Sequence, residues 1–135
     1  MAVVTVWTDG YADAQGAGWA FVARGDREAR RSGALPPCPS HVAEWTATAR
    51  ALAWAEEALA DGDELRLRTD SALVAKGLSS RRPRMSGEAA EMRAEARRVL
   101  ARLGERGVRA KVARVPREEN AEADGLAREA ARAQR

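Results

Sequence analysis

Four acidic residues have the types and spacing to do chemistry together, namely Asp9, Glu44, Asp70 and Asp124. Carboxylates that gather without a matching cluster of bases repel one another, and hard divalent cations such as Mg²⁺ or Mn²⁺ stabilise an all-oxygen site of this kind. Two such ions about 4 Å apart form the two-metal arrangement for in-line phosphoryl transfer, in which one ion generates the nucleophile and the other stabilises the leaving oxygen.

The sequence lacks the residues that other common kinds of catalytic or metal site require. Cys38 and His41 form a C-x-x-H pair, but no second cysteine or histidine completes a zinc site, which excludes structural zinc. No phosphate-binding G-x-x-x-x-G-K-[ST] motif occurs, and the single histidine has no plausible nucleophile partner. The chemistry must therefore depend on carboxylates.

Length and composition favour one cytoplasmic domain. The 135 residues, 45% of them hydrophobic, fit a single domain over 1–135, which we expect to be a monomer. One cysteine leaves no intramolecular disulfide partner, which fits a reducing compartment. The sequence shows no signal peptide and no apolar run of membrane-spanning length, so we expect no membrane association. The net charge of +3 permits a polyanionic partner without requiring one.

Apolar patterning predicts an α/β protein with the order βββ-α-β-α-α-β-α. Pro39 separates the first three strands from the rest, and Ser40 is a good N-cap for the first helix. The Asp9-Gly10 pair predicts a turn at the end of the first strand. The predicted strands are 2–8, 18–23, 27–35, 64–69 and 107–115, and the predicted helices are 40–60, 70–77, 85–104 and 119–133.

The predicted connections bring the acidic residues together. A strand, a helical crossover and a further strand favour parallel pairing, so strands 2–8 and 64–69 are expected to lie side by side. Asp9 and Asp70 then emerge at the same sheet edge, where open α/β sheets bind ligands. Each acid alone also has a structural interpretation: a turn residue, a helix cap, a favourable helix-dipole partner or a solvated side chain. Their expected convergence at one sheet edge favours a metal site over these separate structural roles.

Four short motifs carry a resemblance to a known family. In order and at similar intervals they resemble ribonuclease HI, in the archaeal and bacterial variant that has V-P-R-E before the last acid. The resemblance covers nearly the whole chain and implies the ribonuclease H-like fold, a five-stranded mixed sheet flanked by helices. The motifs are V-W-T-D-G (6–10), A-E-W (43–45), R-T-D-S (68–71) and V-P-R-E-x-N-x-x-A-D-x-L-A (115–127).

The resemblance further implies an endonuclease that hydrolyses the RNA strand of RNA/DNA hybrids with two Mg²⁺ or Mn²⁺ ions, leaving 5′-phosphate and 3′-hydroxyl ends. Asp9 would bridge both ions, and Asp124 would hold the ion that activates water. Glu44 and Asp70 would hold the other ion.

The resemblance also implies several contacts with substrate. Arg117 of V-P-R-E would assist catalysis, in place of the histidine of the best-known bacterial form, although it can also be a solvated loop base. Gly10, Ser40 and His41 would contact substrate. Ser40 and His41 stand where the family often has Thr-Asn-Asn, and they have alternative interpretations as an N-cap and an exposed helix-start residue.

Two arginines stand where some members of the family have a larger basic insertion. Arg81 and Arg82 lie in the short basic stretch 79–86, where they can bind the nucleic-acid backbone or form a solvated surface. Two alternative functions stay open. One is a catalytically weak nucleic-acid-binding module, and the other is a related two-metal nuclease acting on double-stranded RNA or DNA junctions.

Overall fold

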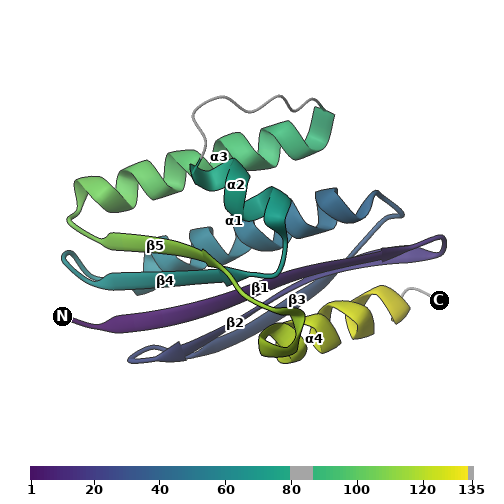
Figure 1. Ribbon diagram of the computed structural model, residues 1–135, viewed down its shortest axis with the longest axis horizontal. Coiled ribbons are helices and arrows are strands. Elements are labelled where there is room, and N and C mark those ends of the chain that lie inside the picture. The colour runs from purple at the N-terminus through teal and green to yellow at the C-terminus, as the bar shows by residue number, and fades with distance from the viewer. Residues whose placement is uncertain (80–86, 134–135) are drawn as a thin grey trace.

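The computed structural model describes residues 1–79 and 87–133, and its elements follow the predicted order (Figure 1). A single 3-10 turn, η1, precedes the last helix. The strands are β1 (Val3–Asp13), β2 (Gly16–Gly25), β3 (Ala29–Leu35), β4 (Glu64–Thr69) and β5 (Arg109–Arg114). The helices are α1 (Ser40–Ala58), α2 (Ala72–Ser79), α3 (Gly87–Glu105), η1 (Arg117–Asn120) and α4 (Ala121–Arg132).

The five strands form one mixed sheet in the order β3-β2-β1-β4-β5. The pairs β1–β2 and β2–β3 are antiparallel, whereas β1–β4 and β4–β5 are parallel. The predicted parallel pairing of the first and fourth strands is therefore confirmed. The mixed five-stranded sheet also confirms the predicted α/β fold class.

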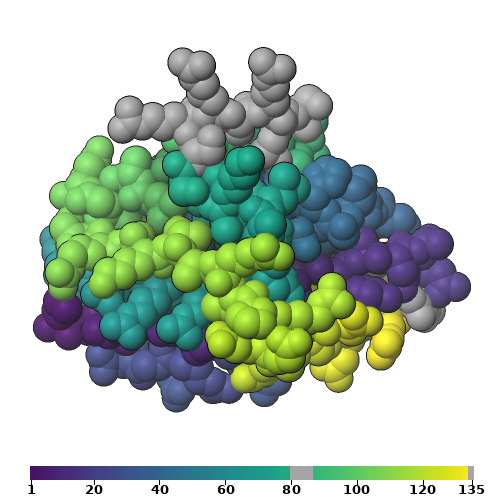
Figure 2. All heavy atoms as spheres, in the orientation of Figure 1, coloured from purple at the N-terminus to yellow at the C-terminus, as the bar shows by residue number. Residues whose placement is uncertain are grey.

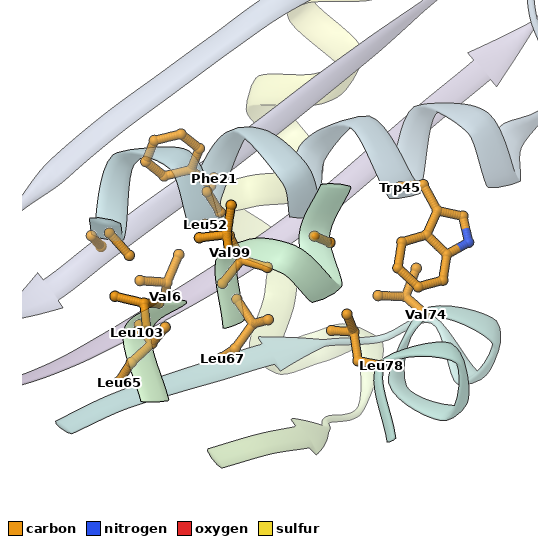
Figure 3. Close-up of a cluster of buried hydrophobic side chains, with 14 of the residues drawn as sticks. Val6, Phe21, Trp45, Leu52, Leu65, Leu67, Val74, Leu78, Val99 and Leu103 are labelled. Atoms are coloured by element: carbon orange, nitrogen blue, oxygen red, sulfur yellow. The ribbon is translucent and has the colours of Figure 1, made fainter. Parts of the chain in front are cut away.

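Helices cover both faces of the sheet. Helices α1, α2 and α3 lie on one face, and α4 lies on the other against β1, β2 and β3 (Figure 1). No helix in residues 1–79 and 87–133 combines the length and apolar character that crossing a membrane requires. The main core fills the space between the sheet and the first helical layer (Figure 3), and its large members include Val6, Phe21, Trp45, Leu52, Leu65, Leu67, Val99 and Leu103.

The first strand is longer than predicted, and the expected turn at Asp9-Gly10 is wrong. The parallel ladder with β4 ends at the pair Thr8–Thr69, but the antiparallel ladder with β2 continues to the pair Asp13–Gly16. The Asp13 carboxylate accepts hydrogen bonds from the next backbone N–H groups, at Gln15 and Gly16, and so forms the turn. Long-range pairing with β2 thus overrides the local turn tendency of Asp-Gly.

The starts of two helices also differ from prediction. Pro39 is the N-cap of α1, with no side-chain capping bond, and Ser40 is already helical. The predicted last helix begins instead as the 3-10 turn η1, and α4 starts at Ala121. The Ser40 side chain is therefore not used as a cap.

Two glycines allow helices to approach the β1–β2 hairpin closely from opposite faces. A Cβ atom added to Gly10 would lie 2.3 Å from the Ala43 carbonyl carbon and the Glu44 nitrogen of α1. A Cβ atom on Gly18, which pairs with Tyr11, would lie 2.2 Å from the Ala127 carbonyl oxygen of α4. Only glycine fits at these two contacts without displacing helix backbone.

We expect Gly10→Ala to destabilise the fold by about 1–3 kcal/mol, because the methyl group must push α1 away from β1. Urea unfolding measures this loss. Gly104→Ala is the matched control, since a Cβ atom there meets no heavy atom within 4 Å and a helical glycine gains about 0.5–1 kcal/mol from alanine. Equal stability of Gly10→Ala and the wild type would contradict the packing argument.

Candidate active site

Three of the predicted acidic residues form one compact group. Asp9, Glu44 and Asp70 each offer a carboxylate oxygen, and these oxygens all lie within 4.8 Å of one another. They come from three separate elements: the middle of β1, the second turn of α1 and the residue after β4. The fold thus brings together residues that are 26 or more positions apart in the sequence.

The sheet places Asp9 and Asp70 at the point where β1 and β4 separate. The parallel ladder ends at the pair Thr8–Thr69, and each acid is the next residue in its chain. Ser71 rather than Asp70 caps α2, because its Oγ atom accepts a hydrogen bond from the Val74 N–H at 3.2 Å. The Asp70 carboxylate is therefore not needed as a helix cap and lies with the other acids.

Glu44 is held from two sides. Its backbone nitrogen is one of the atoms that pack directly over Gly10, so this contact fixes its distance from Asp9. The Ser71 hydroxyl donates a hydrogen bond to its carboxylate. A glycine contact and a serine hydrogen bond thus orient the one acid that α1 contributes.

Asp124 lies beside this group but is not one of the three. It is in the first turn of α4 and shares a hydrogen bond with Asp9. Its Oδ2 atom accepts a second hydrogen bond, from Arg128 Nε at 2.9 Å. Asn120 fixes the start of this helix, since its buried Nδ2 donates to the Thr8 carbonyl oxygen at 2.9 Å, next to Asp9.

Crowding makes ionisation of the group costly. Burial raises the pKa of Asp9 to about 8, and the hydrogen bond with Asp124 and the charges of Asp70 and Asp124 act in the same direction. Burial also raises the pKa of Glu44, which the Ser71 hydrogen bond and the positive charge of Arg117 partly oppose. Without a cation, Asp9 therefore keeps its proton at neutral pH.

A cleft of about 510 Å³ opens onto this group of acids. It is lined by Glu44 and Asp70 and by the segment that runs from the end of β5 to the start of η1. Figure 2 shows that segment on the surface next to α2, in yellow-green beside teal. Its residues in the cleft are Arg114, Val115, Pro116 and Arg117.

Of the other predicted site residues, one lines the cleft and three lie on β1 or α1 near the acids in sequence. Arg117 lines the cleft, in η1 rather than in a loop. Ser40 and His41 are exposed at the start of α1, one turn before Glu44. Gly10 packs under α1. The predicted contacts Arg81 and Arg82 lie outside the described residues.

Sequence reasoning assigned no role to three residues that shape the site, namely Ser71, Asn120 and Arg128. Ser71 and Asn120 belong to the four sequence motifs, which could have drawn attention to them. Their hydrogen bonds, however, are to segments distant in the chain. Arg128 is four residues after Asp124 in α4, a spacing at which a basic and an acidic side chain can pair.

The donor set fits a hard divalent cation. The clustered groups are all carboxylates, two of them half-buried and one buried, and neither a cysteine nor a histidine is among them. Burial first, and then the neighbouring acids Asp124 and Asp70, raise the pKa of Asp9 and make its charged form costly. A divalent cation would supply the missing positive charge.

We expect metal-free protein to lose stability as the pH rises from about 5.5 to 8.5. The raised pKa of Asp9 means that the folded state holds a proton that the unfolded state has already released above about pH 4, so folding becomes less favourable as pH increases. Asp9→Asn removes this cost and raises the free energy of unfolding at pH 8.5 by at least about 1 kcal/mol. Thermal unfolding with a chelator at several pH values measures both effects.

Glu57→Gln serves as the control for this experiment, because Glu57 is exposed at the opposite end of α1. It should keep the pH dependence of the wild type. If Asp9→Asn also kept the pH dependence of the wild type, the raised pKa of Asp9 would be wrong.

Several solved structures with the same fold are ribonucleases H. RNase H1 from the halophilic archaeon Halobacterium salinarum NRC-1 superposes with a TM-score of 0.80 at 27% identity, over 95% of this chain and 96% of that chain. The N-terminal RNase H domain of a Mycobacterium tuberculosis protein gives 0.80 at 22% identity, over 99% and 96%. LC11-RNase H1, in complex with an RNA/DNA hybrid, gives 0.75 at 24% identity, over 94% and 95%.

Sequence comparison alone finds no such relative: no protein-family model and no curated protein matches the chain. The similarity lies in the three-dimensional structure, and it extends over nearly the whole length of both chains in each pair. The strand order and the helical layers confirm the fold that the motifs implied. The chain is a ribonuclease H-like protein.

Proposed function

We propose that this chain is a ribonuclease H, a metal-dependent endonuclease that hydrolyses the RNA strand of RNA/DNA hybrids and leaves 5′-phosphate and 3′-hydroxyl ends. The group of three carboxylates, two of which line the cleft, carries the proposal. The same fold in several RNase H1 proteins supports it, as does the hybrid complex of LC11-RNase H1. We further propose that residues 1–135 form a single ribonuclease H domain.

The proposed cofactors are two Mg²⁺ or Mn²⁺ ions held by the four acidic residues, Asp9, Glu44, Asp70 and Asp124. When bound, such ions supply the Lewis acidity that activates water and stabilises the leaving oxygen. Asp9 must lose its proton to act as a ligand, so metal binding at neutral pH releases a proton. The Ser71 hydrogen bond keeps the Glu44 carboxylate oriented towards the site.

The proposed substrate contacts are Arg117 in the cleft and two residues at the start of α1. Arg117 is placed to bind a phosphate oxygen, because it lines the cleft and its positive charge acts on Glu44. Ser40 is one helical turn before Glu44 on the same face of α1, and His41 is next to it. Both have side chains that can hydrogen-bond a ribose 2′-hydroxyl, the group that distinguishes RNA from DNA.

Asp70→Asn should abolish Mg²⁺- or Mn²⁺-dependent cleavage of a labelled RNA/DNA hybrid while leaving the fold intact, because it removes a charged ligand without changing the volume of the side chain. Gel analysis of the cleavage products and circular dichroism measure the two effects. Asp61→Asn is the control, since Asp61 is exposed before the other end of β4. Undiminished cleavage by Asp70→Asn would overturn the proposed function.

The substrate class is tested by comparing a hybrid, a double-stranded RNA and a four-way DNA junction under the same conditions. We expect cleavage of the hybrid in its RNA strand, with 5′-phosphate products. Binding of the hybrid without cleavage in either metal would show a binding module instead. Preferential cleavage of double-stranded RNA or of the junction would assign the site to a related two-metal nuclease.

Arg117→Ala should lower kcat for the hybrid by about tenfold or more, because the substitution removes the cleft-lining positive charge that acts on Glu44. Arg117→Lys keeps the charge but loses the planar guanidinium, so it should retain part of the activity. Single-turnover cleavage rates separate this effect from weaker binding. Equal rates for all three proteins would show that Arg117 is only a solvated base.

A further inference from the structure

We propose that Arg128 competes with the divalent cation for the Asp124 carboxylate and so sets the metal affinity of the site. The inference rests on the proposed function, because it concerns the same acidic residues. Arg128 is then a positioning residue that acts on a ligand and not on the substrate.

The contact between the two side chains is direct. Arg128 Nε donates to Asp124 Oδ2 at 2.9 Å, four residues along α4, and both side chains are partly exposed. Of the four acidic residues of the site, Asp124 alone has an ion pair within residues 1–79 and 87–133. The compact group of three carboxylates does not include Asp124, which is joined to that group through its hydrogen bond with Asp9 and is paired with the arginine on its other side.

The β1–β2 hairpin holds the arginine from its other side. The guanidinium carbon lies 4.6 Å from the centroid of the Tyr11 ring, a cation–π distance. The Tyr11 hydroxyl donates to Asp13 Oδ2 at 3.2 Å, and Asp13 Oδ1 accepts the backbone N–H groups that form the turn. Arg128 is therefore held between Asp124 and the aromatic ring.

These contacts predict the direction in which Arg128 changes the metal affinity. The guanidinium occupies an oxygen of Asp124 and neutralises part of the charge that would attract a cation. A divalent ion that recruits Asp124 must displace this hydrogen bond or share the carboxylate with it. Removing the arginine removes the competing charge, so the ion should bind more tightly, while the metal-free site loses its internal counter-charge.

The test is a Mn²⁺ titration of substrate-free protein, followed by isothermal calorimetry and by the rise in Tm. For Arg128→Ala we expect the half-saturating Mn²⁺ concentration to fall by about threefold or more, and the metal-free Tm to fall. Arg128→Lys keeps the competing charge and should lie between the wild type and Arg128→Ala. Arg132→Ala is the matched control, because it removes one positive charge from the same helix, one turn farther along.

Several results would overturn the inference. If Arg128→Ala bound Mn²⁺ with unchanged affinity, the arginine would not compete with the ion. If it bound Mn²⁺ more weakly, the arginine would instead hold Asp124 in place for the ion. If Arg132→Ala bound Mn²⁺ more tightly by the same factor, the effect would come from net charge alone. A wild type that binds no Mn²⁺ would overturn the proposed function as well, whereas a binding wild type with an unaltered Arg128→Ala overturns this inference alone.

Discussion

The close approach of two helices to one β-hairpin is the constraint on which the rest of the structure depends. Gly10 allows the backbone of α1 to pack directly against one face of the hairpin, and Gly18 does the same for α4 on the opposite face. Helix α1 carries Glu44, and α4 carries Asp124. A methyl group at either glycine would overlap helix backbone. The convergence of these acids on Asp9 therefore requires glycine, which has no side chain, at both positions.

That convergence has an electrostatic cost that polar neighbours only partly offset. Burial and like charges raise the pKa of Asp9, so the metal-free site keeps a proton there. Arg128 pairs with Asp124, and a Ser71 hydroxyl hydrogen-bonds Glu44. The site therefore lowers the stability of the metal-free fold, as expected where stability is exchanged for function.

Much of the fold followed from local pattern. The β-α-β order predicted that strands β1 and β4 are parallel neighbours, and the register places Asp9 and Asp70 directly after their last shared pair. The errors came where tertiary pairing overrides local tendency. Asp9-Gly10 resembles a turn, but pairing with β2 keeps the chain extended, and Ser40 resembles an N-cap, but Pro39 occupies that position.

The sequence by itself determined which residues can do chemistry, because residue type, order and spacing fix the donor atoms and the element that carries each one. It thereby indicated four acids, their strands and helices, and the α/β order. Only the tertiary structure decided that three carboxylates meet within 4.8 Å and that Arg128, the partner of Asp124 within α4, lies over the Tyr11 ring of β1. These distances depend on packing and hydrogen bonds between segments far apart in the chain, which no local pattern encodes.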